Sequence, residues 1–316
     1  MHTAFDREFA SVVAGIVMFL TAATAVGQSL RARAHTAARM AAMANLNARI
    51  ASWWAMCTVV LGSLLIGPIG AVLLFALLSG GALREYFSLT PTRRGDHRVL
   101  VLVFFIAIPV QYWLVAARWY GLFAILIPVY GLLCLSAAAA LAGDTVRFLE
   151  RIARIQWGLM VCVYGVSHAP ALLMLDIPGY AGQNAKLLLY LILVVESSDV
   201  LQYIWGKLCG RHPIAPTVSP SKTVEGFVGG IATATLLGAA LSPITPFTPW
   251  QSAFLSLAAT ITGFAGGLVM SAIKRDRGVK DFGTAIAGHG GVLDRIDSLC
   301  FAAPIFFHLT RYFFAA

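Results

Sequence analysis

The run LLLYLILVVESSDVLQYIWGKLCGR, residues 187–211, decides the fold class, because it is long and apolar enough to cross a lipid bilayer as a helix. Glu196 and Asp199 lie three residues apart inside this run, so both side chains project from one face of that helix. An unpaired charge inside an apolar span is costly. The two carboxylates therefore predict a cation beside them.

The remainder of the chain repeats this apolar character. Of its 316 residues, 59% are hydrophobic and only 12% are charged, whereas a soluble domain carries about a quarter charged residues. The mean hydropathy is +0.80. We therefore predict an all-α, polytopic integral membrane protein with about ten transmembrane helices. The apolar runs cover residues 9–28, 51–67, 69–83, 99–115, 120–142, 157–175, 187–205, 226–242, 250–272 and 298–314.

The basic residues sort to alternate loops. The chain has 23 Lys and Arg residues and a net charge of +9, and all but Arg7, Arg118, Lys186 and Arg311 lie in the loops 29–50, 84–98, 144–156, 206–225 and 273–297. An excess of Lys and Arg marks cytoplasmic loops, so the charge does not indicate a nucleic-acid partner. We expect these loops in the cytoplasm, both termini outside, and the protein in a bacterial inner membrane.

Two regions are predicted. Residues 1–156 form an N-terminal transmembrane region of about five spans plus amphipathic surface helices at 31–50 and 144–157. Arginines at helical spacing in the second segment favour a helix on the membrane surface, with a clamp for lipid headgroups as the alternative. Residues 157–316 form the catalytic transmembrane region. The five scattered cysteines indicate neither a disulfide framework nor a zinc site.

The stretch SAIKRDRGVKDFGTAIAGHGGVLDRID, residues 271–297, is the most polar part of the chain and the main site candidate. It contains Lys274, Arg275, Arg277, Lys280, Arg295, Asp276, Asp281, Asp294, Asp297 and His289. A second polar loop, HPIAPTVSPSKTVEG at 212–226, offers hydroxyls, Lys222 and the start of a helix. Such groups suit phosphate oxygens, although a merely solvated loop would have a similar composition.

The predicted topology brings the inner ends of the last four spans together at the cytoplasmic boundary. Clustered carboxylates suit Mg²⁺, which typically binds one or two carboxylates plus substrate phosphates. Interleaved Lys and Arg side chains suit further phosphate charge. The residues alone therefore favour phosphoryl or nucleotidyl transfer to a lipid at the membrane surface.

The same stretch resembles the signature of the phosphatidate cytidylyltransferase (CDP-diacylglycerol synthase) family. The resemblance is carried by Ser271-x-x-Lys274-Arg275, Lys280-Asp281-Phe282-Gly283 and His289-Gly290-Gly291-Val292-Leu293-Asp294-Arg295-Ile296-Asp297, with Ser219-Pro220-Ser221-Lys222-Thr223-x-Glu225-Gly226 upstream. Four departures indicate a divergent branch. The chain has Leu201-Gln202 where the family has Gly-Ala, Gly267 and Met270 where it has carboxylates, and Ala287 where it has proline.

The resemblance implies transfer of a cytidylyl group from CTP to phosphatidate, or a related lipid phosphate, giving CDP-diacylglycerol and pyrophosphate. It implies Mg²⁺, with one cation or two, and it is compatible with a homodimer in the lipid bilayer. Catalytic roles are expected for Lys280, Asp281, His289 and Asp294. Metal ligands are expected at Asp199, Asp281, Asp294 and Asp297. Substrate-binding roles are expected for Ser219, Lys222, Thr223, Glu225, Ser271, Lys274, Arg275, Gly290, Gly291 and Arg295.

Three alternatives remain at this stage. A CTP-dependent lipid-alcohol kinase would transfer the γ-phosphate and release CDP. A non-enzymatic membrane transporter would also carry intramembrane charges, but the charges here gather at one predicted face. A catalytically inactive relative would explain the missing carboxylates.

Overall fold

The computed structural model describes residues 7–33, 35–286 and 290–315, and nearly all of its regular structure is helical. The N-terminal region contains α1 (Arg7–Ala32), α2 (Ala37–Ile66), α3 (Pro68–Ser88), η1 (Arg94–Asp96), α4 (His97–Leu102), η2 (Val103–Ala107), α5 (Ile108–Ala116), α6 (Tyr120–Ile125), η3 (Leu126–Gly131), α7 (Leu132–Leu141) and α8 (Phe148–Leu159). The rest contains η4 (Met160–Gly165), α9 (Val166–Ala171), η5 (Leu172–Met174), α10 (Asn184–Cys209), β1 (Pro213–Ala215), β2 (Ser219–Thr223), α11 (Val224–Ala240), η6 (Ser242–Ile244), α12 (Pro249–Asp276), α13 (Leu293–Ile296) and α14 (Leu299–Phe314).

Helices occupy all ten predicted apolar runs, which confirms an all-α polytopic membrane protein. Within the described ranges, eight helical segments are long and apolar enough to cross a membrane. The helix α11 is a shorter apolar helix, and α14 has 16 residues. Three spans, at 94–116, 120–141 and 148–174, each contain a π-helical turn. Pro109, Pro128 and Pro170 lie in or near these turns, where a missing backbone N–H favours irregular helix geometry.

Most of each segment expected as a surface helix is continuous with a longer apolar helix. Residues 37–50 are the first half of α2, a single 30-residue helix that packs on α1. This half is rich in alanine and free of glycine and proline, so nothing interrupts the helix. Residues 148–157 likewise continue into the span that ends at Met174. Arg151 points into the protein, where it pairs with Asp96 at 2.9 Å, and is therefore not a headgroup clamp.

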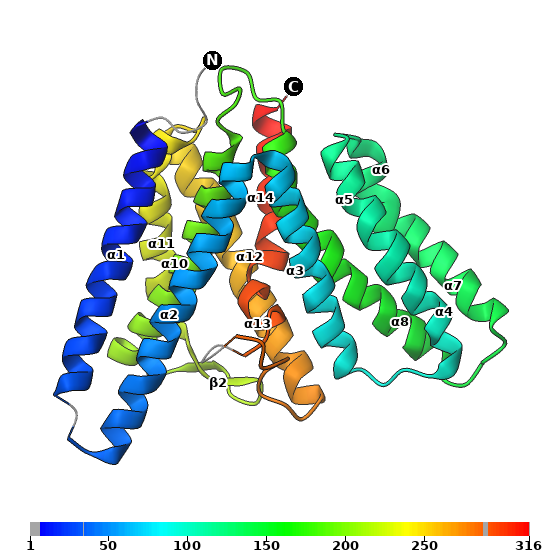
Figure 1. Cartoon of the computed structure of the whole chain (residues 1–316), viewed down its shortest axis with the longest axis horizontal. Helices are drawn as coiled ribbons and strands as arrows, with labels where there is room; N and C mark the ends of the chain where they lie inside the picture. The colour runs from blue at the N-terminus through cyan, green and yellow to red at the C-terminus, as the bar shows by residue number, and fades with distance from the viewer. Residues whose placement is uncertain (1–6, 34, 287–289, 316) are drawn as a thin grey trace.

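The polar loops gather at one end of the bundle. Figure 1 shows the turns after α1, α3 and α7, the β1–β2 hairpin and the loop before α13 at the lower end, with both chain ends at the upper end. These are the five basic loops of the sequence. The alternation deduced from Lys and Arg placement thus agrees with the arrangement of the helices, while the compartment that this end faces stays a prediction.

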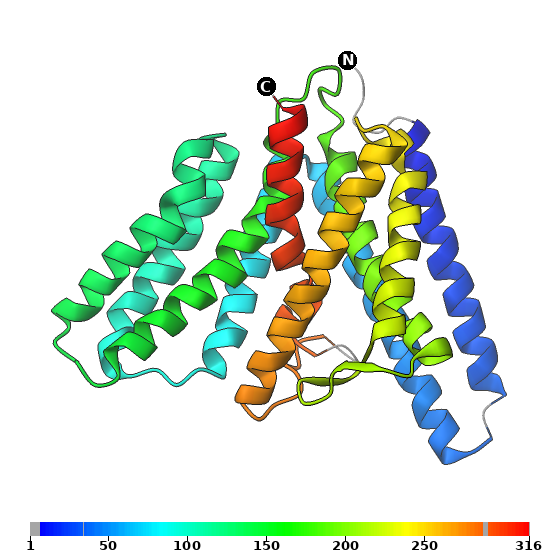
Figure 2. The same ribbon diagram turned by 180° about the vertical axis from the view of Figure 1, so that it is seen from behind.

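The core lies where α3, α9 and α14 meet, and α10, α11 and α12 form a second packed group beside it (Figure 2). Close approach of α10 and α11 depends on glycine. A Cβ atom added to Gly230 would lie 2.6 Å from the backbone nitrogen of Gln202, and one added to Gly229 would lie 2.7 Å from the Trp205 ring. This packing fixes the inner half of α10, which carries Glu196 and Asp199, against its neighbours.

Candidate active site

The inner half of α10 contributes the carboxylate of Asp199. The Ser298 hydroxyl donates a hydrogen bond of 2.6 Å to Asp199 Oδ2, and this contact joins α10 to the start of α14. The charges of Lys222 and Arg295 act on the same carboxylate. Asp199 and these two cations come from three segments of the chain, α10, β2 and α13.

The β1–β2 hairpin brings Lys222 to this group. The hairpin is antiparallel, with Pro213 paired to Thr223, and Thr223 then caps α11 by accepting a 3.1 Å hydrogen bond from the Gly226 amide. Lys222 Nζ lies 4.6 Å from the centroid of the Phe264 ring. Burial lowers the pKa of Lys222, while the charges of Asp199 and Asp297 act in the opposite direction.

Several predicted substrate-binding residues hold this hairpin in place. The Glu225 carboxylate accepts hydrogen bonds from the amides of Arg211 (2.9 Å) and His212 (3.2 Å). The Arg275 guanidinium donates to the carbonyl oxygens of Val218 and Val279. Ser271 donates to the Gly267 carbonyl oxygen within α12. Ser219 is the first residue of β2, and no direct role beyond this placement follows for it.

Asp294 organises the loop before α13. Its Oδ1 forms an ion pair with Lys274 Nζ at 2.8 Å. Its Oδ2 accepts from the amides of Phe282 (2.8 Å) and Gly291 (2.9 Å), and the residue is only 4% exposed. Three hydrogen bonds occupy most of the acceptor sites of this carboxylate, so its contacts are those of a residue that fixes the loop.

Glycine is required at the centre of that loop. Gly290 has φ +82°, and a Cβ atom there would lie 3.2 Å both from the Asp281 Cβ and from the Asp294 Cγ. The loop therefore brings Asp281 and Asp294 close together where Gly290 lacks a side chain. Lys280 and Asp281 are both exposed, so they lie at the mouth of the site. His289 lies outside the described residues.

Asp297 and Arg295 complete the group between α13 and α14. Burial, followed by the negative charge of Asp199, raises the pKa of Asp297 to about 6. Arg295 Nε is buried and has no hydrogen-bond partner among the described residues. A buried guanidinium nitrogen without a partner is costly, and an anionic ligand would satisfy it.

The structure thus brings six of the predicted residues into one charged group: Asp199, Lys222, Lys274, Asp294, Arg295 and Asp297. Ser219, Thr223, Glu225, Ser271 and Arg275 lie in its frame, and Gly290 and Gly291 shape its loop. We call the six residues the charged cluster.

A metal ion at the charged cluster would need ligands beyond the side chains that the structure describes. In the part of the chain that the structure describes, no group of three or more His, Cys, Asp or Glu side chains could hold a metal by itself. However, Asp199 and Asp297 repel each other inside the protein, and a divalent cation would relieve this repulsion. Mg²⁺ needs only one or two carboxylates when substrate phosphates supply further ligands.

The sequence did not point to Glu85, which contacts the same loop from α3. Its carboxylate oxygens accept hydrogen bonds from the amides of Val292 and Leu293, both at 2.9 Å. The residue follows Arg84 at the end of an apolar run, where a charged pair is typical of the polar end of a span. Glu85 lies more than 200 residues from the loop in the sequence, so the contact could not be predicted from a local motif.

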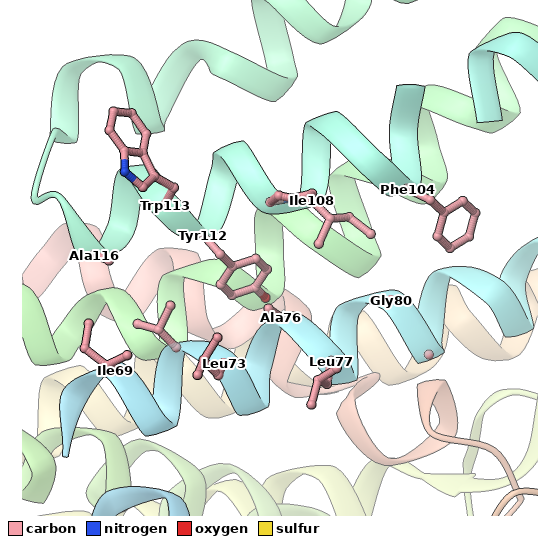
Figure 3. Close-up of a pocket in the computed structure, with 13 residues that line it drawn as sticks. Ile69, Leu73, Ala76, Leu77, Gly80, Phe104, Ile108, Tyr112, Trp113 and Ala116 are labelled. Carbon is pink, nitrogen blue, oxygen red and sulfur yellow. The ribbon is translucent and has the colours of Figure 1, made fainter. Parts of the chain in front are cut away.

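An apolar groove borders the site on the α3 side. Figure 3 shows it between α3 and α5, with Leu73, Leu77 and Trp113 among its lining residues, and its volume is about 630 Å³. The Tyr112 hydroxyl at its wall is hydrogen-bonded to Ser79 Oγ at 2.6 Å. At its inner end, a Cβ atom on Gly81 would lie 3.7 Å from Val292, so the groove ends beside the loop that carries Asp294.

Comparisons with known proteins identify the family and relatives of this chain. Residues 47–313 match the model of the cytidylyltransferase family. The chain is 42% identical over 266 residues to Uncharacterized protein YnbB of Escherichia coli K12, covering 84% of this chain and 87% of that protein. It is 40% identical over 129 residues to the phosphatidate cytidylyltransferase of Mycobacterium leprae, covering 40% of this chain and 41% of that protein.

The phosphatidate cytidylyltransferase of Staphylococcus haemolyticus is 40% identical over 120 residues, which cover 37% of this chain and 46% of that protein. The chain therefore aligns with less than half the length of these two enzymes, whereas it aligns with most of YnbB. This pattern agrees with a divergent branch. Because the family model covers most of the chain, the protein belongs to the cytidylyltransferase family and is an integral membrane enzyme of this type.

Proposed function

We propose that this enzyme transfers the cytidylyl group of CTP to phosphatidate or a related lipid phosphate, forming CDP-diacylglycerol and pyrophosphate. The observation that carries the proposal is the charged cluster, in which cations and carboxylates from α10, β2, α12 and the α13–α14 junction meet at one end of a membrane protein. Both substrates carry phosphate groups, and one of them is a lipid. A mixed-charge site near a bilayer surface suits both.

The proposed roles within the charged cluster depend on which side-chain groups have no direct partner in the protein and can therefore bind a substrate. Lys222 and the Arg295 Nε have no carboxylate in direct contact among the described residues, so they are the best placed to hold phosphate oxygens. Lys274 is tied to Asp294 and contributes its charge from that position. The amides of 291–293 are already bonded to carboxylates, so phosphate binding falls to side chains.

Asp199 and Asp297 are the proposed main ligands of Mg²⁺, with Asp281 at the mouth as a third carboxylate that approaches when substrate binds. When bound, Mg²⁺ neutralises charge on the triphosphate and so helps pyrophosphate to leave. Asp294 is retained in the proposed site as the residue that fixes Lys274 and the loop. His289 and Lys280 are proposed to position phosphate groups.

The reaction requires an oxygen of the lipid phosphate to attack the α-phosphorus of CTP in line, with the pyrophosphate oxygen leaving from the opposite side. The attacking phosphate is already ionised, so no general base is needed for this step. The contribution of the protein is to align the two charged reactants and to offset their mutual repulsion. The apolar groove that ends at Val292 suits an acyl chain of such a lipid.

We further propose that the end of the bundle that carries the cluster faces the cytoplasm of a bacterial cell. Nineteen of the Lys and Arg residues lie in loops at that end (23 in total, less the four named above). This is the distribution expected for loops on the inner side of the membrane. Cytoplasmic CTP would then reach the site directly.

The test is an assay of the purified protein with labelled CTP, phosphatidate and Mg²⁺. We expect a labelled CDP-lipid together with one pyrophosphate for each turnover. Release of CDP without pyrophosphate would instead show a lipid kinase, and no use of CTP with any lipid phosphate or alcohol would remove the proposed function. Substituting other nucleoside triphosphates and other lipid phosphates in the same assay identifies the preferred pair.

A further inference from the structure

Glu85 holds the end of the loop that leads into α13, although it belongs to the opposite half of the chain. It lies in the last turn of α3 and is half-buried. One carboxylate oxygen accepts from the Val292 amide and the other from the Leu293 amide. A carboxylate that bridges two successive amides fixes both the position and the direction of that peptide segment.

The glycines of the loop make room for this carboxylate. A Cβ atom added to Gly291 would overlap the Glu85 Oε2 atom. A Cβ atom added to Gly283 would lie 2.8 Å from Glu85 Oε1. Two segments of the loop therefore lie against the Glu85 carboxylate, which would have to move if either glycine carried a side chain.

Glu85 and Asp294 accept hydrogen bonds from successive amides of this segment. Asp294 accepts from Phe282 and Gly291, and Glu85 accepts from the two amides that follow Gly291. The chain then turns into α13, which carries Asp294 and Arg295. A shift of this peptide segment would therefore move the side chains of Arg295 and of Asp294, the ion-pair partner of Lys274, together.

We propose that Glu85 is a positioning residue for the cytidylyl-transfer site: it anchors the 291–293 segment so that Arg295 and the Lys274–Asp294 pair keep their places in the charged cluster. It acts through the loop and does not touch substrate. The catalytic consequence rests on the proposed function above, whereas the anchoring itself does not. It also means that α3, in the N-terminal region, forms part of the active-site structure.

The test compares three variants of the full-length protein in detergent or nanodiscs. Glu85→Ala removes both acceptors, and Glu85→Gln keeps one acceptor oxygen while its amide group faces an N–H donor. Arg84→Ala is the matched control, because Arg84 is the exposed neighbour on the same helix turn. Each variant is measured for cytidylyl transfer and for hydrogen exchange of the peptide covering residues 290–296.

For Glu85→Ala we expect exchange in this peptide to be about tenfold faster, the factor expected when a charge-assisted hydrogen bond is lost. The kcat should fall about 10–100-fold, as for residues that orient a ligand set without joining it, while the KM for CTP changes less than threefold. Glu85→Gln should lie between wild type and Glu85→Ala in both measurements. Arg84→Ala should match wild type.

Unchanged exchange at 290–296 in Glu85→Ala and Glu85→Gln would overturn the anchoring. Faster exchange with wild-type kcat would overturn the positioning role. Faster exchange over the whole protein would show a general structural role and would also overturn it. If the wild-type protein forms no CDP-lipid, the proposed function fails, but the exchange result for residues 290–296 still decides whether Glu85 anchors the loop.

Discussion

Two arginines with buried guanidinium nitrogens illustrate the difference between a structural and a functional charge cluster. Arg151 of α8 is 5% exposed, and its nitrogens contact the Asp96 and Asp144 carboxylates and the carbonyl oxygens of Asp144 and Val146. Arg295 of α13 has a buried Nε without a partner among the described residues. The first arginine uses all its nitrogens within the protein, whereas the second keeps one available.

The surrounding carboxylates differ in the same way. Asp96 is 1% exposed, and its two oxygens are bonded to Arg151 and to the Arg93 amide. In the charged cluster, Asp199 and Asp297 remain close enough for mutual repulsion. Burial and ion pairing alone therefore do not mark a site. What distinguishes the charged cluster is a buried guanidinium donor without a hydrogen-bond partner among the described residues, because a ligand can then supply the missing acceptor.

The largest effect is expected from Asp294→Asn. A neutral amide cannot balance Lys274, and its NH₂ group must face either Lys274 Nζ or the amides of Phe282 and Gly291. Losing one preorganised electrostatic contact at a reacting site typically lowers kcat about 10²–10³-fold, so we expect CDP-lipid formation to fall by roughly that factor. The assay is run on the fraction that elutes as folded protein. Asp276→Asn changes an exposed carboxylate at the end of α12, the helix that carries Lys274, and should retain full activity. Equal rates for the two variants would refute the role of Asp294.

Changes among Asp96, Asp144 and Arg151, which pair with one another, should lower the stability of the protein and leave its turnover unchanged. Asp96→Asn removes one of the two carboxylates that contact Arg151 and leaves Asp144 in place, so we expect the free energy of unfolding to fall by about 1.5–3 kcal/mol, measured by denaturant unfolding in detergent. The turnover of the protein that remains folded should not change. Glu150→Gln removes an exposed partner of Arg147 and Arg154 and should cost less than about 1 kcal/mol. A similar loss in both variants would contradict the difference in burial.

Much of the fold could be predicted from the sequence because a bilayer allows few solutions. Apolar runs located every span, and alternating basic loops assigned all five polar loops to one end of the bundle. The hydropathy and charge patterns did not predict that a span continues as the same helix into a polar segment. The segment at 37–50 is polar enough for a surface helix, but helix propensity carries α2 through it without a break.

The site was predictable where its residues lie in one dense motif and less so where they are isolated. Lys274, Asp294 and Asp297 fall within one stretch of 27 residues (271–297). Asp199 was identified because a carboxylate in an apolar run is conspicuous. Glu85 was not, because it follows Arg84 at the end of a span, and Asp96 was assigned no role because its loop is polar throughout. Which charges are satisfied depends on packing, and packing is not visible in the sequence.

Asp199→Asn tests the metal role with little change in shape. The amide oxygen of asparagine can still accept the hydrogen bond from Ser298 Oγ, so the variant removes charge and keeps the contact. We expect the Mg²⁺ concentration for half-maximal rate to rise about 10–100-fold. Ser298→Ala removes the contact and keeps the charge, and it should shift the Mg²⁺ dependence less. An unchanged Mg²⁺ titration in Asp199→Asn would remove this residue from the proposed ligands.

The smallest effects are expected from replacing each of the two arginines, Arg295 and Arg151, with lysine. Lysine keeps the charge of arginine but lacks its fork of donors, so Arg295→Lys should raise the KM for CTP about tenfold with an unfolding midpoint close to that of wild type. Arg151→Lys should do the reverse, because its lost donors leave the carbonyl oxygens of Asp144 and Val146 without partners. Its unfolding midpoint should fall, and its KM for CTP should stay within twofold. If both variants changed the same quantity, the contrast between a satisfied and an available guanidinium would not explain where this enzyme binds its substrates.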